Sequence, residues 1–112
     1  MRDHLLGLWL VALLLSASTA FAASAENGQR VFMRAGCWQC HGTLGQGGVT
    51  GPKLAPDPLP FETLSSFVRT TSRAMPPYSK QILSDDDLAD IYTYLQSIPK
   101  GPDPKTIPLL NP

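Results

Sequence analysis

Residues 37–41 read Cys37-Trp38-Gln39-Cys40-His41, and this stretch decides what the rest of the chain must fold around. The pattern C-x-x-C-H is the attachment signature of a c-type haem. Two thiols separated by two residues can reach both vinyl groups of the porphyrin from one helical turn, and the next imidazole can then ligate the iron. The sequence therefore predicts one covalently bound haem c, held by Cys37 and Cys40, with His41 as a metal ligand.

A C-x-x-C pair also occurs in thioredoxin-type redox motifs and in halves of zinc sites. A four-ligand zinc site needs two more ligands, but the chain has no other cysteine and only one other histidine, His4. A thioredoxin-like domain needs strands that alternate with helices, and no strand pattern of useful length occurs here. Both readings stay minor alternatives to haem attachment.

The amino-terminal residues have the pattern of a secretory signal. Arg2 precedes an apolar run from Leu5 to Leu15, and Ala20-Phe21-Ala22 supplies a small-x-small cleavage site. The apolar run is short for a membrane span, which takes about twenty residues. We expect residues 1–22 to be removed on export to the periplasm, which leaves no membrane insertion in the mature chain; the alternative is an uncleaved anchor.

Three later segments carry the apolar periodicity of amphipathic helices. The first precedes the cysteines, the second opens at Pro60, and the third follows Ser84 and stops before Pro99. Ser84 is a natural N-cap, and Asp87 can complete a capping box. The expected apolar stripes are Gly28, Val31, Phe32 and Ala35; Phe61, Leu64, Phe67 and Val68; and Leu88, Ile91, Tyr92, Leu95 and Ile98.

Between the first two helices, residues 42–60 are rich in glycine and proline, a composition that indicates a loop around one haem edge. The fold class is therefore all-α: residues 23–98 form one domain, with three main helices around a single covalently attached haem. The formal net charge is zero and no basic run occurs, so nothing indicates a nucleic-acid partner.

The second axial ligand cannot be another histidine of the mature chain, since His4 lies in the predicted leader. Met33 falls inside the first helix, where we expect packing. Met75 precedes Pro76-Pro77, which fix an extended backbone and present the thioether at a rigid point. We expect His41 and Met75 to be the axial pair, a ligation that raises the reduction potential; the alternative for Met75 is core filling.

Together these features resemble the small monohaem class I cytochromes c of bacteria, from Glu26 to Ile98. The resemblance rests on the haem motif, on Gly28 and Phe32, on Gly51-Pro52, on Met75-Pro76-Pro77, and on Ile91, Tyr94 and Leu95. It implies the cytochrome c fold, with Gly28 admitting a close crossing of the first and last helices. It also implies a place for Pro52 in the cofactor-binding site, where its carbonyl accepts a hydrogen bond from the ligand imidazole.

The function implied is one-electron transfer, not catalysis by the chain itself. Partners are expected to be redox proteins that dock transiently at the haem edge. The alternatives are a cytochrome subunit of a periplasmic dehydrogenase complex and a haem sensor or peroxidase with an open sixth site. Met75 argues against the last of these.

Two other features have less specific readings. Arg69 and Arg73 are expected to be solvated, with a haem propionate as the alternative partner. The tail, residues 99–112, holds five of the eleven prolines but also Ile107, Leu109 and Leu110. We expect these apolar residues to pack onto the body of the protein; docking to a partner and a disordered end are the alternatives.

Overall fold

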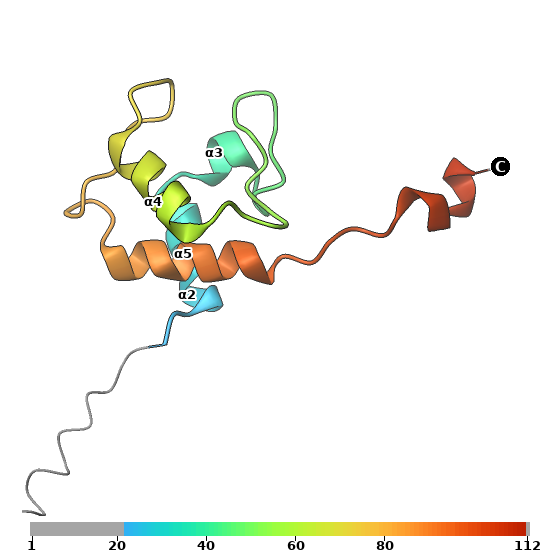
Figure 1. The fold of residues 1–112 in the computed structure, drawn as a ribbon, viewed down its shortest axis with the longest axis horizontal. Helices are drawn as coiled ribbons and strands as arrows, with labels where there is room; N and C mark the ends of the chain where they lie inside the picture. Colours follow the sequence, from blue (N-terminus) through green and yellow to red (C-terminus); the bar gives the residue numbers. More distant parts are fainter. Residues whose placement is uncertain (1–21, 112) are drawn as a thin grey trace, which may run out of the picture.

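The structure is a computed structural model that describes residues 22–111. Within this range it is helical and contains no β-strand, with α2 (Ala25–Arg34), α3 (Trp38–His41), α4 (Phe61–Thr70) and α5 (Asp85–Ser97), followed by short 3-10 turns η1 (Pro104–Thr106) and η2 (Pro108–Leu110) (Figure 1). The all-α prediction is confirmed: there are three longer helices, α2, α4 and α5, and a short one, α3, which with its N-cap Cys37 makes up the haem motif. The predicted leader lies outside the described residues except for Ala22 and stays a prediction.

Helices α2 and α5 cross closely and form the centre of the domain (Figure 1). A Cβ atom on Gly28 would lie only 2.9 Å from the backbone nitrogen of Ile91, so the predicted role of this glycine is confirmed. The ring of Phe32 packs against that of Tyr94 at a centroid distance of 5.7 Å. The buried apolar core is made of Val31, Phe32, Ala55, Leu64, Leu83, Leu88, Ile91, Tyr94 and Leu95.

The apolar stripe of α5 differs in part from the expected one. Tyr94 is buried, whereas Tyr92 and Ile98 are only partly buried. Tyr92 lies at the flank of the crossing, where its ring packs against Phe61 at 5.2 Å. Tyr94 combines the two roles of a buried tyrosine, because its ring joins the core while its hydroxyl donates to the Thr43 carbonyl at 2.8 Å.

The helix starts follow capping chemistry, with two corrections. Ser84 caps α5 as predicted, since its Oγ accepts a hydrogen bond from the Asp87 backbone nitrogen at 3.0 Å. The Asp87 carboxylate does not complete a capping box; it is turned toward α2, where it accepts hydrogen bonds from Asn27 and Arg34 at 3.4 Å. Pro60 is the N-cap of α4 and not its first helical residue.

The irregular segments 42–60 and 71–84 lie on the same side of α5 as α3 and α4 (Figure 1). Segment 42–60 folds back on itself, because the backbone nitrogens of Leu54 and Ala55 donate to the Gly45 carbonyl at 2.7 and 2.9 Å. Gly45 adopts φ 65°, the left-handed region that glycine tolerates. In the described part of the chain, no helix is both long and apolar enough to cross a bilayer.

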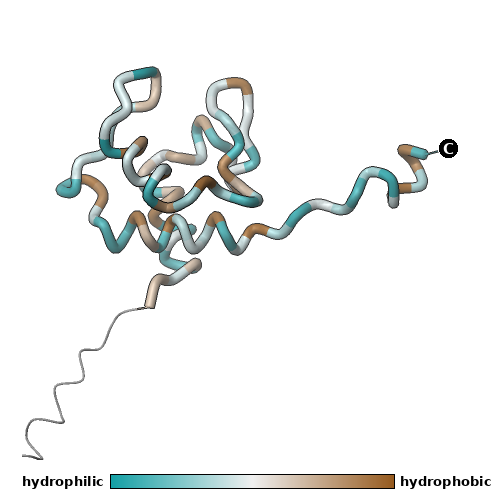
Figure 2. The backbone as a smooth tube through the Cα atoms, in the orientation of Figure 1, coloured by the Kyte–Doolittle hydropathy of each residue, from teal (hydrophilic) through white to brown (hydrophobic). Residues whose placement is uncertain are grey.

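The carboxy-terminal tail projects from the body, so the expectation that it packs there is wrong (Figure 1). Leu109 is 92% exposed and Leu110 62% exposed, and Figure 2 shows this apolar end far from the helices. The proline-rich stretch after α5 holds the backbone extended. The tail is tied at its base, where Lys100 pairs with Asp57 at 3.0 Å. Its tip is ordered by Asn111, which donates to the Pro104 carbonyl at 2.7 Å.

Candidate haem site

The C-x-x-C-H motif is placed by the way α2 ends. Beyond the C-cap, Gly36 has φ 81° and its nitrogen donates to the Met33 carbonyl, while the Cys37 nitrogen donates to the Phe32 carbonyl at 3.1 Å. This pair of bonds is a Schellman motif, which ends a helix and reverses the chain. The turn carries Cys37 directly into α3.

Helix α3 brings the two thiols onto one turn. Cys37 is its N-cap, and the backbone nitrogens of Cys40 and His41 donate to the Cys37 carbonyl at 3.3 and 3.0 Å. Residues three apart on a helical turn lie on the same face. Both thiols are free; Cys37 is half-buried and Cys40 is exposed. The arrangement leaves both sulfurs available for two bonds to one neighbouring group.

The environment of Cys37 speaks against the redox-dithiol alternative. Burial raises the pKa of Cys37 to about 11. A dithiol oxidoreductase instead needs a lowered pKa, because the thiolate is the attacking species. A neutral, apolar-shielded thiol suits a structural attachment point better than a nucleophile.

His41 is buried, and its imidazole is held by a single backbone group. Nδ1 lies 2.8 Å from the Pro52 carbonyl oxygen. A carbonyl can only accept, so Nδ1 carries the proton and the neutral ring has its lone pair on Nε2, the form that binds a metal. The hydrogen bond between His41 and Pro52 that the resemblance implied is therefore confirmed.

Gly51 makes this hydrogen bond possible. A Cβ atom at residue 51 would lie 2.7 Å from the Cys40 carbonyl oxygen and 3.0 Å from His41 Nδ1. The segment thus approaches α3 closely enough for Pro52 to reach the ring only because residue 51 has no side chain. The sequence already held this signal in the Gly51-Pro52 pair.

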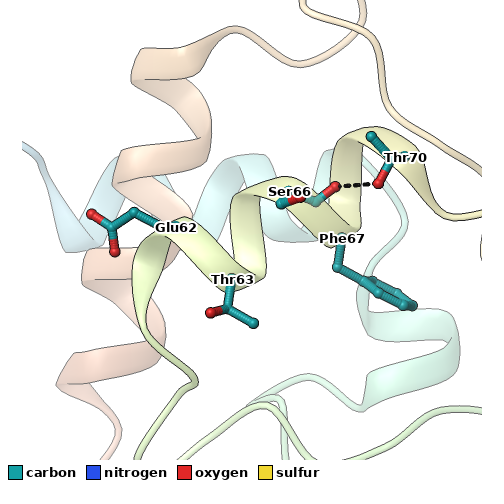
Figure 3. A pocket seen from close by; sticks show the side chains of 5 residues that line it. All are labelled: Glu62, Thr63, Ser66, Phe67 and Thr70. Carbon is teal, nitrogen blue, oxygen red and sulfur yellow. Dashed lines mark hydrogen bonds between the residues drawn. The ribbon is translucent and has the colours of Figure 1, made fainter.

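A hollow of about 520 Å³ lies along α4, lined by Glu62, Thr63, Ser66, Phe67 and Thr70 (Figure 3). Phe67 was expected in the apolar stripe of α4, yet its side chain is 50% exposed and borders this hollow. Leu64 is the one residue of α4 that is buried in the core. The hollow is shallow and open, and residues of α4 alone line it. The two free thiols and the oriented imidazole suit a haem, which takes two thioether bonds and an axial imidazole.

Met75 lies half-buried in the irregular segment between α4 and α5, as its Pro-Pro sequence predicted. Met33, the other methionine of the described residues, is on α2 and 38% exposed, so the packing expected of it is only partial.

Arg69 was expected to be solvated, and this is wrong. Its side chain is only 14% exposed and donates to the backbone carbonyls of Tyr78 and Leu83. The alternative partner, a haem propionate, stays a prediction, and the Arg69 Nε atom is buried without a hydrogen-bond partner among the described residues. Sequence periodicity could not predict these hydrogen bonds, because an arginine occupies the same position in the helical pattern whether its side chain is solvated or bound to a loop. Arg73, in contrast, is exposed.

Comparison with known proteins agrees with this site. The family model described as "Cytochrome C oxidase, cbb3-type, subunit III" matches residues 23–95, a range that includes α2, the haem motif, Pro52 and Met75. Cytochrome c-555 of Methylococcus capsulatus is 31% identical over 107 residues, covering 88% of this chain and 84% of that protein. No solved structure matches significantly. The chain therefore belongs to the cytochrome c family, as a small monohaem member whose cofactor is haem c and whose role is electron transfer.

Proposed function

We propose that this protein is a periplasmic one-electron carrier, with one haem c attached through Cys37 and Cys40 and ligated by His41 and Met75. In the attachment, each thiol adds across one vinyl double bond; a sulfur–carbon bond forms and the thiol proton passes to the other vinyl carbon. The addition needs no net oxidant. Residues 1–22 act as the export signal that delivers the chain to the compartment where attachment takes place.

The observation that carries the proposal is the buried His41 imidazole, hydrogen-bonded at 2.8 Å to the Pro52 carbonyl and adjacent in sequence to a free thiol. This bond orients the ring and makes Nε2 a stronger donor to a metal. The bound haem supplies the ferric–ferrous couple. The chain's part is to hold two ligands in place in both states, so that little rearrangement accompanies transfer.

Partners of such a carrier are redox proteins that bind weakly and briefly. Trp38, between the two attachment cysteines, is 39% exposed, so its ring can border the surface where a partner docks beside the haem. A donor and an acceptor can dock there in turn. This function is electron carriage and not catalysis by the chain.

A second candidate is a cytochrome subunit of a larger periplasmic dehydrogenase complex. The specific observation in its favour is the projecting tail, whose ordered tip exposes Leu109 and Leu110. A freely diffusing carrier has no evident need for such a tip. A haem sensor or peroxidase is less well supported, since it needs an open sixth position and Met75 is available to fill it.

The proposal is tested by producing the full chain in a bacterial host with the c-type maturation system. The purified protein should have the mass of residues 23–112 plus one haem and should keep its colour through acid-acetone extraction. Changing Cys37 or Cys40 to Ala should leave little stable holoprotein. Extractable haem in the unaltered protein would contradict covalent attachment, and recovery only from the cytoplasm would contradict export.

A further inference from the structure

Tyr78 joins the segment that carries Met75 to the segment that carries the thiols. Its hydroxyl donates to the Ala35 carbonyl at 2.8 Å, and its backbone nitrogen donates to the Val68 carbonyl at 2.9 Å. Tyr78 lies three residues after Met75, and Ala35 lies two residues before Cys37. One side chain thus spans the two parts of the chain that would supply opposite sides of the haem site.

Arg69 holds the same segment from the other direction. Its guanidinium donates to the carbonyls of Tyr78 and Leu83 at 2.9 and 2.6 Å and to the Asp85 carboxylate at 2.9 Å. Asp85 is itself held by Lys80 at 2.7 Å. The planar fork of arginine can join several acceptors in one fixed geometry, which lysine cannot do. Arg69 therefore fixes the backbone of the segment that follows Met75 at two points, Tyr78 and Leu83.

We infer that Tyr78 and Arg69 are positioning residues that hold Met75 as an axial ligand. The inference rests on the proposed function, since it presumes that Met75 binds the iron. For Met75 to leave the iron, its segment must move, and the hydrogen bonds of Tyr78 and Arg69 must be lost in that movement. The rate at which an external ligand replaces Met75 therefore depends on these two side chains.

The chemistry of the two residues suits a permanent tie. Burial raises the pKa of Tyr78 above its usual value, so its hydroxyl stays protonated and can donate throughout the neutral range. An arginine stays charged at any physiological pH. Changes of pH within the neutral range therefore do not break the hydrogen bonds that these two side chains donate to backbone carbonyls.

The first test is Tyr78→Phe in the haem-loaded protein, which removes the hydroxyl and keeps the ring. One hydrogen bond of this kind corresponds to about a two- to tenfold change, so cyanide should bind the ferric protein faster by that factor. Tyr94→Phe is the matched control, because its hydroxyl also donates to a backbone carbonyl at 2.8 Å but ties α5 to Thr43. Both variants should lose similar stability to denaturant, but only Tyr78→Phe should speed cyanide binding.

The second test is Arg69→Lys, which keeps the charge but loses the fork. Cyanide binding should be faster by about ten- to a hundredfold. The far-red absorption band that charge transfer from methionine to iron gives the ferric protein should, as pH is raised, disappear at a lower pH than in the unaltered protein. Arg30→Lys is the control, since Arg30 pairs with Glu26 within α2 and both side chains are exposed. If Arg69→Lys yields no holoprotein, Asp85→Asn takes its place, because it removes the exposed end of the same clamp.

The outcomes separate this inference from the proposed function. An unaltered protein without the far-red band would remove both, because Met75 would not be a ligand. A normal band with equal cyanide rates in the Tyr78→Phe and Tyr94→Phe proteins would overturn the positioning role alone. Faster exchange and an altered reduction potential confined to the Tyr78 and Arg69 variants would support it.

Discussion

Gly28 lies directly against the backbone of Asp90, where α2 and α5 cross. A side chain at residue 28 would overlap the Asp90 carbonyl group, and the atoms in its way are backbone atoms that cannot turn aside. The crossing that buries Phe32, Tyr94 and Leu95 is therefore open only to a residue without a Cβ atom.

Gly28→Ala should lower the free energy of unfolding of the holoprotein by about 2 kcal/mol or more, because α2 must shift away from α5. Denaturant unfolding followed by haem absorbance measures this. Gly101→Ala is the control, since nothing lies within 4 Å of a Cβ atom at that position. Equal stability of the two variants would mean that the crossing is not as tight as described.

Gly51→Ala should weaken the bond between His41 Nδ1 and the Pro52 carbonyl, because the new methyl group would meet both Cys40 and His41. A weaker bond makes the imidazole a poorer donor and stabilises ferric iron less. The reduction potential should then rise by tens of millivolts, given that about 59 mV corresponds to a tenfold change for one electron. Gly48→Ala, whose Cβ would lie 3.7 Å from the Cys40 carbonyl, should leave the potential unchanged.

Met75→Ala should abolish the far-red charge-transfer band of the ferric protein and allow cyanide or imidazole to bind readily. The reduction potential should fall by on the order of 0.1 V, because the thioether no longer stabilises ferrous iron. Met33→Ala should change neither property, since that residue is partly exposed on α2. The assignment of the axial ligand is wrong if the Met33 variant loses the band and the Met75 variant keeps it.

Asp85 should make stability depend on pH. Its pKa is lowered in the folded protein, chiefly by the hydrogen bond from Lys80 and further by Arg69. Such a carboxyl stabilises the fold above its unfolded pKa of about 3.9, and this contribution is lost as pH falls through the lower, folded pKa. Asp85→Asn should therefore unfold more easily at pH 7 and match the unaltered protein in strong acid. Lys80→Gln, which removes the main hydrogen-bond donor to Asp85, should reduce the same dependence on pH.

Ending the chain after Lys100 removes the tail but retains the pair between Lys100 and Asp57. The unfolding midpoint should stay the same, because Leu109 and Leu110 are exposed and bury no apolar surface on the body. If the tail docks to a partner, electron exchange with that partner should slow. A lower unfolding midpoint would mean that the tail packs on the body in solution after all.

Local patterns in the sequence were enough for the cofactor and for the helices. The C-x-x-C-H spacing determined the haem motif, because the chemistry of attachment needs both thiols on one turn. Ser84 and Pro99 marked the ends of α5, since capping and the loss of a backbone donor act within a few residues. The roles of Gly28 and of the Gly51-Pro52 pair could be predicted only through the resemblance to a family. The structure gives the steric reason, because a Cβ atom at residue 28 or 51 would collide with neighbouring backbone.

Only the tertiary structure decided the contacts that join distant segments. Nothing local distinguishes Tyr92 from Tyr94, because the rotation of α5 about its axis depends on where α2 crosses it. The fold of Arg69 over the Met75 segment and the bond from Tyr78 to Ala35, 43 residues away in the chain, arise from the packing of three elements together. The tail is a second case in which local sequence was not enough. Its apolar residues predicted burial, but the stiff proline-rich backbone after α5 leads them away from the core, and Leu109 and Leu110 are exposed.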